Sequence, residues 1–497
     1  MTNTNQPKKK LGKGKLIALF AISVVAIFLL GMLAASITER RAEVVSTFLQ
    51  NKVVDIKGIE PHNALWGKNY PREYETWEKT ADMDFQSKYM GNKPQDELAK
   101  HPDMVILWAG YAFSKEYNAP RGHMHAVEDV RSILRTGAPK GEEEGPMPAA
   151  CWTCKSPDVP RMMSEVGINE FYNHKWSKWG SEIMNPIGCA DCHNPETMEL
   201  QISRPALIEA FARQGKDITK ATHQEMRSLV CAQCHVEYYF TKKGNVVTFP
   251  WDDGFTVEDM EKYYDNLEFS DWTNSLSRAP MIKAQHPDFE IYSMGPHAER
   301  GVSCADCHMP YMADGAIKFS DHQIMSPLKN INRTCQTCHN DSEDKLKQMV
   351  YTRQEKALEL RNVLEDLLAN AHLEAAFAWK NGATEAQMKD ALKYIRQAQW
   401  RWDFGVASHG ASFHAPQETQ RILAHGIDKA HEARRALRDV FYALNIQDKY
   451  KRPEFKTKEE AQKLIGLDME QIRADKKEFL QTVVPAWVEK AKKENKL

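Results

Sequence analysis

Ten cysteines form five Cys-x-x-Cys pairs in this 497-residue chain. A spacing of two residues lets both sulfurs of a pair reach the vinyl groups of one porphyrin, while the next residue places a nitrogen on the iron. Histidine follows four pairs and lysine follows the fifth. The motifs are Cys151-Trp-Thr-Cys154-Lys155, Cys189-Ala-Asp-Cys192-His193, Cys231-Ala-Gln-Cys234-His235, Cys304-Ala-Asp-Cys307-His308 and Cys335-Gln-Thr-Cys338-His339. They predict a multihaem c-type cytochrome with five covalently bound haem c groups.

Zinc ribbons, disulfides and thioredoxin-type redox pairs are the other uses of Cys-x-x-Cys. A zinc site needs two such pairs, or a set of Cys and His, to close one tetrahedral shell, and it does not need histidine directly after the second cysteine. The repetition of that placement in four motifs therefore favours haem. An exported chain normally favours disulfides, yet every cysteine here already belongs to a haem motif.

Lys155 is the residue that separates an electron carrier from a catalyst. Histidine on both faces saturates the iron and favours electron transfer, whereas an unusual proximal ligand is typical of a haem whose other face is open. A lysine must lose its proton before it binds a metal. The alternative interpretation is that Lys155 is a surface residue and that a remote histidine supplies the ligand.

The longest interval between haem motifs lies between the third and the fourth, and it contains polar residues that suit a hard cation. Glu237 follows the predicted ligand His235 by two residues, so that motif determines its position. A carboxylate, an amide oxygen and backbone carbonyls are ligands that calcium prefers. The alternative is that this acidic residue beside an aromatic side chain belongs to a solvated face.

The elements that position these motifs begin with an export leader. Lysines at positions 8, 9, 10, 13 and 15 precede the stretch from Leu16 to Ile37, which carries no charge and would span about 33 Å as a helix. Either this segment is an uncleaved membrane anchor, or Ala34, Ala35 and Ser36 mark a cleavage site. In both cases the lysines stay cytoplasmic and the body of the protein is exported.

Composition and motif spacing set the domain organisation. Net charge is −2 with mixed signs, so no nucleic-acid partner is indicated and redox proteins are the expected partners. Five buried macrocycles would form one shared core. We predict a signal peptide or signal anchor over 1–40, a haem-binding catalytic region over 41–340, and a helical region over 341–497 that forms one structural unit with it. The predicted fold is mainly α, with a compact five-haem core, long C-terminal helices and few short strands.

Long helices are predicted after the last haem motif. Apolar residues recur at intervals of three, four or seven between positions 346 and 375, and Gly382 ends that run. A second helix follows, with a capping box formed by Thr384 and Gln387, and a third covers about 416–444. We interpret the apolar stripes as packing surface that braces the haem core or pairs with a second subunit.

The chain resembles the pentahaem cytochrome c nitrite reductases, the ammonia-forming enzymes, over roughly residues 60 to 490. The resemblance rests first on a lysine motif followed by four histidine motifs. Further shared stretches are Cys-His-Val-Glu-Tyr-Tyr-Phe (234–240), Lys-Ala-Gln-His (283–286), Arg-Gly-His (121–123), Leu-Arg-Thr-Gly-Ala-Pro (134–139), Phe-Pro-Trp-Asp-Asp-Gly (249–254) and Trp-Arg-Trp-Asp (400–403).

The resemblance implies a function and a set of site residues. Nitrite would be reduced by six electrons to ammonium at the Lys155 haem, with Arg135, Tyr238 and His286 around its open face. An anion needs a positive pocket, which a permanently charged arginine supplies. One calcium ion would take side-chain oxygens from Glu237 and Gln285 and backbone carbonyls from Tyr238 and Lys283.

The resemblance also implies the second axial ligand of each remaining haem. These are His123 for the His235 haem, His322 for the His193 haem, His414 for the His308 haem and His297 for the His339 haem. Spacing alone does not give these pairs, because His125 and His409 are close competitors for His123 and His414.

Three functions are compatible with the motifs. Periplasmic nitrite reduction would draw electrons from a membrane quinol-oxidising multihaem cytochrome or another periplasmic donor, and the family forms homodimers through its long C-terminal helices. The second hypothesis is a non-catalytic pentahaem conduit, which would have all five irons six-coordinate. The third is oxidation of hydroxylamine, which no extra haem motif or second unusual ligand supports.

Overall fold

The computed structural model describes residues 12–50, 52–315 and 317–497. The chain divides into two compact units, Met1–Asp55 and Ile56–Leu497. Lys8, Lys9 and Lys10 of the predicted leader lie outside the described residues. Helix α1 (Lys13–Gln50) contains an exposed segment, Lys13–Arg40, in which a stretch of 18 residues has a mean hydropathy of 2.9. This segment is long and apolar enough to cross a membrane, which suits both a signal sequence and an anchor.

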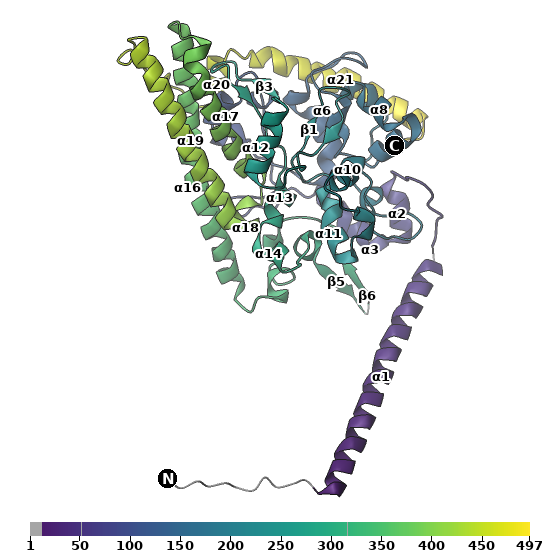
Figure 1. Ribbon diagram of the computed structural model, residues 1–497. Helices are drawn as coiled ribbons and strands as arrows, with labels where there is room; N and C mark the ends of the chain where they lie inside the picture. The colour runs from purple at the N-terminus through teal and green to yellow at the C-terminus, as the bar shows by residue number, and fades with distance from the viewer. Residues whose placement is uncertain (1–11, 51, 316) are drawn as a thin grey trace, which may run out of the picture. The chain divides into compact units, whose positions relative to one another are not determined.

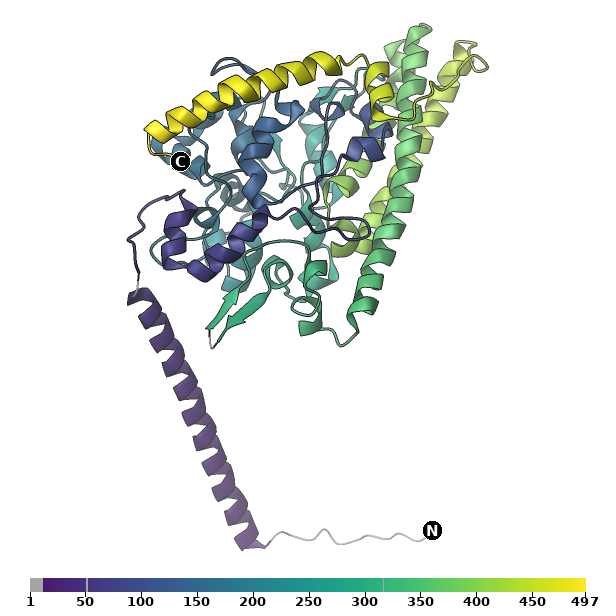
Figure 2. The ribbon, with the colours of Figure 1, turned by 180° about the vertical axis from the view of Figure 1, so that it is seen from behind.

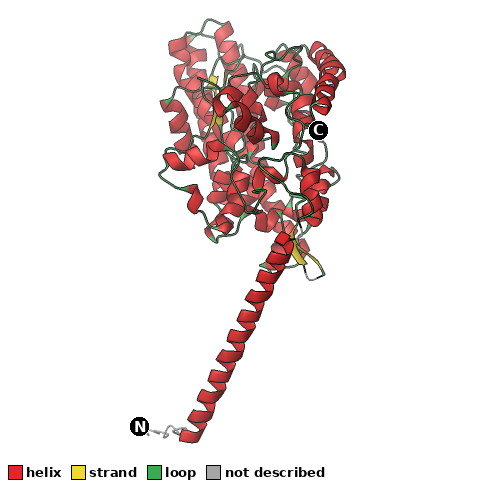
Figure 3. Ribbon diagram, turned by 90° about the vertical axis from the view of Figure 1, so that its right-hand side faces the viewer, coloured by secondary structure: helices red, strands yellow, loops and turns green. Residues whose placement is uncertain are grey.

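The second unit consists mainly of helices, as Figure 3 shows in red, so the prediction of a mainly α fold is confirmed. Most helices before residue 340 are short. They are α2 (Asn63–Asn69), α3 (Pro71–Glu78), α4 (Glu97–Lys100), α5 (Asp103–Leu107), α6 (Ala126–Ser132), α7 (Asp158–Val166), α8 (Ile168–Tyr172), α9 (Cys189–Cys192), α10 (Pro205–Arg213), α11 (His223–Ala232), α12 (Val257–Asn266), α13 (Asp288–Ser293), α14 (Pro296–Glu299) and α15 (Cys304–His308).

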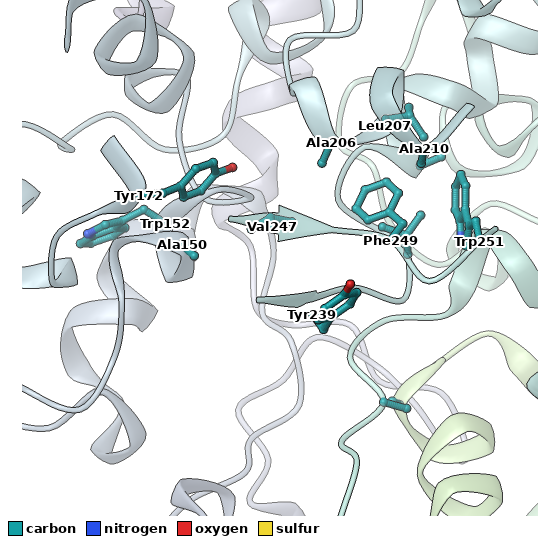
Figure 4. Close-up of a cluster of buried hydrophobic side chains, with 14 of the residues drawn as sticks. Ala150, Trp152, Tyr172, Ala206, Leu207, Ala210, Tyr239, Val247, Phe249 and Trp251 are labelled. Carbon is teal, nitrogen blue, oxygen red and sulfur yellow. The ribbon is translucent and has the colours of Figure 1, made fainter. Parts of the chain in front are cut away.

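The strands are few and short, again as predicted. They form three antiparallel pairs: β1 (Tyr239–Phe240) with β2 (Val247–Thr248), β3 (Trp272–Thr273) with β4 (Pro280–Met281), and β5 (Tyr311–Asp314) with β6 (Ile317–Ser320). In the first pair Tyr239 lies opposite Thr248. Figure 4 shows Tyr239 and Val247 on this hairpin, with Phe249 and Trp251 packed beside Leu207. The hairpin begins directly after Glu237 and Tyr238, so its buried core holds both residues in place.

Two haem motifs fold into helical turns because of their own aspartates. In α15 the side chain of Ser303 accepts a hydrogen bond from the backbone N–H of Asp306 (3.3 Å), and the Asp306 carboxylate accepts one from the N–H of Ser303 (2.7 Å). This capping box satisfies two N–H groups that a helix start leaves unpaired. In α9 the carboxylate of Asp191 accepts from the N–H of Gly188 (2.8 Å) in the same manner.

Three long helices form one side of the second unit. Helices α16 (Glu343–Lys380), α17 (Glu385–Ala407) and α19 (Pro416–Ala443) lie side by side in Figures 1 and 2, with the short α18 (Ala411–His414) between the last two in sequence. The predicted stop at Gly382 and the predicted capping box of Thr384 and Gln387 are confirmed. Gly382 has a φ of 88°, and the Gln387 side chain accepts from the N–H of Thr384 (2.8 Å).

Two helices after residue 450 lie in the predicted helical region of 341–497 but were not predicted individually. They are α20 (Lys458–Leu464) and α21 (Met469–Lys493), and α21 lies across α6 in Figure 1. Helix α21 contains Pro485 and buries few side chains, among them Lys476 and Phe479. It also contacts the 3-10 turn Leu134–Thr136, which carries Arg135.

Candidate functional site

A cavity of about 1530 Å³ lies inside the second unit, and cysteines from all five pairs line it. A pocket for one drug-sized ligand has a volume of about 300–1,000 Å³. The cavity therefore has room for more than one large group. Its size and its cysteines fit covalently attached haem.

Four pairs of histidine rings lie close together at this cavity, and seven of the eight residues line it, His339 being the exception. Their ring centroids lie 6.5 Å apart for His123 and His235, 6.2 Å for His193 and His322, 6.3 Å for His297 and His339, and 6.3 Å for His308 and His414. Two imidazole nitrogens bound at about 2 Å on opposite sides of one metal, with each ring centroid about 1.1 Å further out, give centroids about 6.3 Å apart. The structure thus brings together each histidine pair that the resemblance implies, at a separation that fits one iron between them.

Hydrogen bonds at the other ring nitrogen orient several of these histidines. The Nδ1 atoms of His193 and His308 lie 2.9 Å from the carbonyls of Met198 and Met325, and Nδ1 of His322 lies 2.8 Å from the carbonyl of Ser320. A ring that donates from Nδ1 presents Nε2 as a lone pair for a metal. His235 differs, because its Nδ1 lies 3.5 Å from the carboxylate of Asp288.

The competitor histidines have different surroundings. Nε2 of His125 lies 3.0 Å from the carbonyl of Ala81, and its Nδ1 lies 3.4 Å from Glu128. Both ring nitrogens are therefore engaged, which leaves His123 as the neighbour of His235. His409 lines the cavity, but His414 is the residue whose ring faces His308.

The predicted catalytic residues line the same cavity. Lys155, Arg135, Tyr238 and His286 all contribute to its wall, and the rings of Tyr238 and His286 lie 6.5 Å apart. The Arg135 guanidinium stacks on the ring of Phe113 at 4.0 Å, a cation–π contact that orients it, and Arg135 takes part in no ion pair among the residues that the structure describes. Arg135 therefore keeps its positive charge for an anion in the cavity.

Lys155 is positioned by the segment that precedes it. Its N–H donates to the carbonyl of Trp152 (2.9 Å), and the fully buried indole of Trp152 donates to the carbonyl of Trp176 (2.8 Å). The turn that follows Cys151 is thereby tied to the aromatic core, so Lys155 projects from a rigid segment.

The surroundings of His286 favour its neutral form. Burial lowers the pKa of His286 well below its ordinary value of 6.5, and the neighbouring charge of Lys155 is the second cause. A neutral imidazole donates a hydrogen bond from one nitrogen and accepts at the other. His286 can therefore bind an anion by hydrogen bonding instead of by a standing positive charge.

Three of the four predicted calcium ligands lie together, and Tyr238 follows one of them directly. The Glu237 carboxylate accepts hydrogen bonds from the N–H of Gln285 (2.5 Å) and the hydroxyl of Tyr264 (2.9 Å), and the Gln285 side-chain amide lies 3.1 Å from the carbonyl of Lys283. Within the described part of the chain, no cluster of three or more His, Cys, Asp or Glu side chains suits a metal ion. A cation here would depend on Glu237 together with carbonyl and amide oxygens.

The electrostatics of this cluster fit a cation. Glu237 is fully buried, and burial raises its pKa well above the ordinary value, with the carboxylates of Glu290 and Asp271 raising it further. A divalent ion would stabilise the ionised carboxylate and reverse that effect. The Lys283 ammonium pairs with Asp403 at 2.7 Å, while the backbone carbonyl of Lys283 faces the side chain of Gln285 within the cluster.

Several residues that support the site were not predicted from the sequence. Arg204 and Asp191 form a buried ion pair between haem motifs, Lys476 supports the turn that carries Arg135, and Asp288 faces His235. Asp191 belongs to a Cys-Ala-Asp-Cys motif, and its place three residues after Gly188 is the signal of a helix start. The other three residues carry no local signal, because their partners are distant in the chain.

Comparisons with known proteins give consistent results. A family model for cytochrome c552 matches residues 62–496. A cytochrome c-552 of Parabacteroides distasonis is 63% identical over 490 residues, 99% of each chain, and one of Bacteroides thetaiotaomicron is 63% identical over 475 residues, 96% of each chain. The solved catalytic subunit of cytochrome c nitrite reductase from Desulfovibrio desulfuricans, described as having two calcium sites, superimposes with a TM-score of 0.75 at 30% identity, covering 84% of this chain and 91% of that one.

Proposed function

Since this chain belongs to the cytochrome c552 family and is a cytochrome c nitrite reductase, we propose that it reduces nitrite by six electrons to ammonium at a haem attached to Cys151 and Cys154 and bound by Lys155. The observation that supports this best is the common cavity. Lys155, Arg135, Tyr238 and His286 line one space together with the cysteines of all five motifs.

Haem c at these motifs would supply redox centres that each accept and pass on one electron at a time. The chain supplies the rest. Four facing histidine pairs at 6.2 to 6.5 Å would hold four bis-histidine haems, and Lys155 would leave the opposite side of the fifth open to substrate. This arrangement suits a reaction that consumes six electrons, because the four bis-histidine haems would lie beside the site and pass electrons to it.

The cavity wall around Lys155 has the groups that an anionic substrate needs. Arg135 holds a fixed positive charge, His286 offers an N–H donor, and the hydroxyl of Tyr238 is a second polar group on the same wall. Burial raises the pKa of Tyr238 well above 10, so the hydroxyl keeps its proton and acts as a hydrogen-bond donor. These three residues would bind nitrite and orient it.

Calcium would act through the backbone that carries these groups. Glu237 directly precedes Tyr238, and Gln285 directly precedes His286, so an ion bound to Glu237, Gln285 and the carbonyls of Tyr238 and Lys283 would hold both catalytic segments together. It would also place positive charge near the anion. We propose a periplasmic location, a homodimer, and a quinol-oxidising multihaem cytochrome or another periplasmic protein as electron donor.

Nitrite turnover by the purified protein tests the function. With reduced viologen as donor, fully haem-loaded protein should consume nitrite and release one ammonium per nitrite without free nitric oxide. Stoichiometric nitric oxide, or no consumption by protein with five haems per chain, would reject the proposal.

Electron paramagnetic resonance separates the enzyme from a pentahaem conduit. A bis-histidine iron is low-spin because two strong nitrogen ligands split its d orbitals widely. The Lys155 iron should give a high-spin or spin-coupled signal that changes when nitrite or cyanide is added. If all five irons are low-spin and indifferent to both ligands, the chain is a conduit.

A further inference from the structure

Arg204 is a fully buried arginine, 1% exposed, that lies between haem motifs instead of at the surface. Its Nε donates to the carbonyl of Thr153 (2.6 Å), and its Nη2 donates to the carbonyl of Ser156 (2.9 Å). These two carbonyls lie on either side of Cys154 and Lys155. One guanidinium therefore clamps the short backbone segment that carries the lysine.

The same guanidinium also binds the next haem motif. Nη2 of Arg204 also lies 2.5 Å from the carboxylate of Asp191, and Nη1 donates to the hydroxyl of Ser203 (2.6 Å). The Asp191 carbonyl accepts in turn from the side-chain amide of Gln233 (2.9 Å), which belongs to the third motif. Arg204 thus connects the Lys155 segment to a polar network that joins three attachment motifs.

The geometry requires an arginine at this position. A planar guanidinium can donate in several fixed directions at once, whereas a lysine ammonium is a single point on a flexible stem. Arg204 also lies within Coulombic range of Cys154, Cys192 and Cys234, which are attachment residues of three different motifs. A fixed positive charge near an iron favours its reduced, less positive state.

We propose that Arg204 is a positioning residue for the active site: it fixes the backbone on both sides of Lys155 and holds a permanent positive charge beside the haem attached there. This inference rests on the proposed ligation of iron by Lys155. Arg204 faces the motif and its cavity wall and is not assigned contact with nitrite.

Arg204→Lys and Arg204→Gln separate the positioning of the Lys155 backbone from the effect of the positive charge. Arg204→Lys keeps the charge but cannot bridge both carbonyls, so the single spin-state signal of the Lys155 haem should split or broaden and nitrite turnover should fall by about 10 to 100-fold. Arg204→Gln removes the charge as well, so the reduction potential of that haem should also fall. Both readouts are spectroscopic and need no turnover: electron paramagnetic resonance of the oxidised holoenzyme and spectroelectrochemical titration.

Arg227 provides a matched control. It is also a buried arginine, and it pairs with Asp306 of the other Cys-Ala-Asp-Cys motif (3.0 Å) and donates to Ser303 (3.3 Å). Arg227→Lys makes the same chemical change beside a different haem. It should leave the signal and the cyanide response of the Lys155 haem as in the wild type.

The outcomes distinguish the inference from the function on which it rests. If wild-type protein has no ligand-responsive iron, the proposed function fails. If the wild type has one and both Arg204 variants keep its signal and potential, this inference is overturned and the function stands. Should the Arg204 variants lose haem during maturation, Asp191→Asn loosens Arg204 without removing it. A wild-type signal in fully loaded Asp191→Asn protein overturns the inference, and a broadened one supports it.

Discussion

Lys155 occupies the position that four other motifs give to histidine, and the two side chains differ in what they demand of their surroundings. An imidazole binds a metal in its ordinary neutral form, while an ammonium must first lose a proton. The turn from Cys151 to Lys155 is tied down by Trp152 and by Arg204, so the protein holds the lysine in place where a flexible side chain would otherwise remain solvated.

Replacing Lys155 with histidine tests the proposed role of the lysine as the axial ligand. Lys155→His converts the motif to the regular form and leaves both attachment cysteines in place. We expect near-normal folding, five haems per chain and a large loss of nitrite turnover, because the axial ligand sets the electronic properties of the iron. Haem quantification by pyridine haemochrome controls for attachment. Wild-type turnover in the loaded variant would contradict the role assigned to Lys155.

Substitution of Arg135 tests the anion site and leaves the iron ligands unchanged. Arg135→Ala removes the positive charge that stacks on Phe113 and should lower kcat/KM for nitrite by roughly 10 to 1,000-fold. Arg135→Lys is the control, because it keeps the charge without the planar stack and should retain part of the activity. Unchanged efficiency in the alanine variant would mean that Arg135 does not face the substrate.

Among single residues, local patterns in the sequence predict the haem attachment and the first ligand, whereas the second ligands followed only from the family resemblance. The Cys-x-x-Cys spacing alone predicts the attachment residues and the first axial ligand, because thioether attachment and the following residue act within one turn. The second ligands depend on tertiary contacts. His123 and His125 look alike in the sequence, and only the bonds of His125 to Ala81 and Glu128 show why the two differ.

Among the elements, the three long helices were predictable and α21 was not, for a physical reason. Helices α16, α17 and α19 pack against one another and need wide apolar stripes. Helix α21 lies across the surface of the second unit and buries little beyond Lys476, Phe479 and Ala491, so its sequence has no strong periodicity. A proline at position 485 further weakens the helical signal.

Lys476 gives α21 a role in the site. The residue is 4% exposed, and its ammonium donates to the carbonyl of Arg131 and the hydroxyl of Thr136, both at 3.1 Å, so it supports the turn that presents Arg135. Burial lowers the pKa of Lys476 to about 8, while Glu116 raises it and Lys115 lowers it further. Since the unfolded chain binds this proton up to about pH 10.4, the wild type should gain stability as pH rises from about 8 to 10.

Lys476→Met should abolish that gain. Compared with the variant, wild-type protein should become more stable between pH 8 and pH 10 by no more than about 3 kcal/mol, measured as the difference in urea unfolding at the two values. Lys477→Met, which changes an exposed neighbour on the same helix, should keep the wild-type pH dependence. Parallel wild-type and Lys476→Met curves would show that the ammonium titrates normally.

For the whole molecule, retention or cleavage of the N-terminal leader determines whether the protein is bound to the membrane. Helix α1 continues without interruption through Ala34, Ala35 and Ser36 to Gln50, and its exposed segment Lys13–Arg40 would be about 42 Å long. We expect it to be retained as an anchor. Membrane fractions washed with carbonate should keep the protein, and its intact mass should include residue 37 and those before it. A mature form that begins just after Ser36, found in the soluble fraction, would show cleavage instead.

The apolar surface of the long helices is buried either entirely within one chain or partly against a second subunit. Much of their apolar surface packs internally, but Val363 on α16 is 51% exposed and Tyr442 on α19 is 64% exposed. Single exposed apolar residues are common on protein surfaces, so the expectation of a second subunit rests on the family resemblance and these residues only mark where it would bind. We therefore expect a homodimer through α16 and α19.

Light scattering of the purified protein should give about twice the chain mass of 56.9 kDa, plus the mass of the haems, at micromolar concentration. Introducing Val363→Asp together with Tyr442→Asp should shift the protein towards the monomer, because each buried carboxylate would lack a partner across the interface. Ile208→Asp on α10 changes an apolar residue that is 43% exposed but lies on a different element, so it should leave the mass unchanged. A wild-type monomer under these conditions would mean that α16 and α19 serve only to brace the haem-binding region of their own chain.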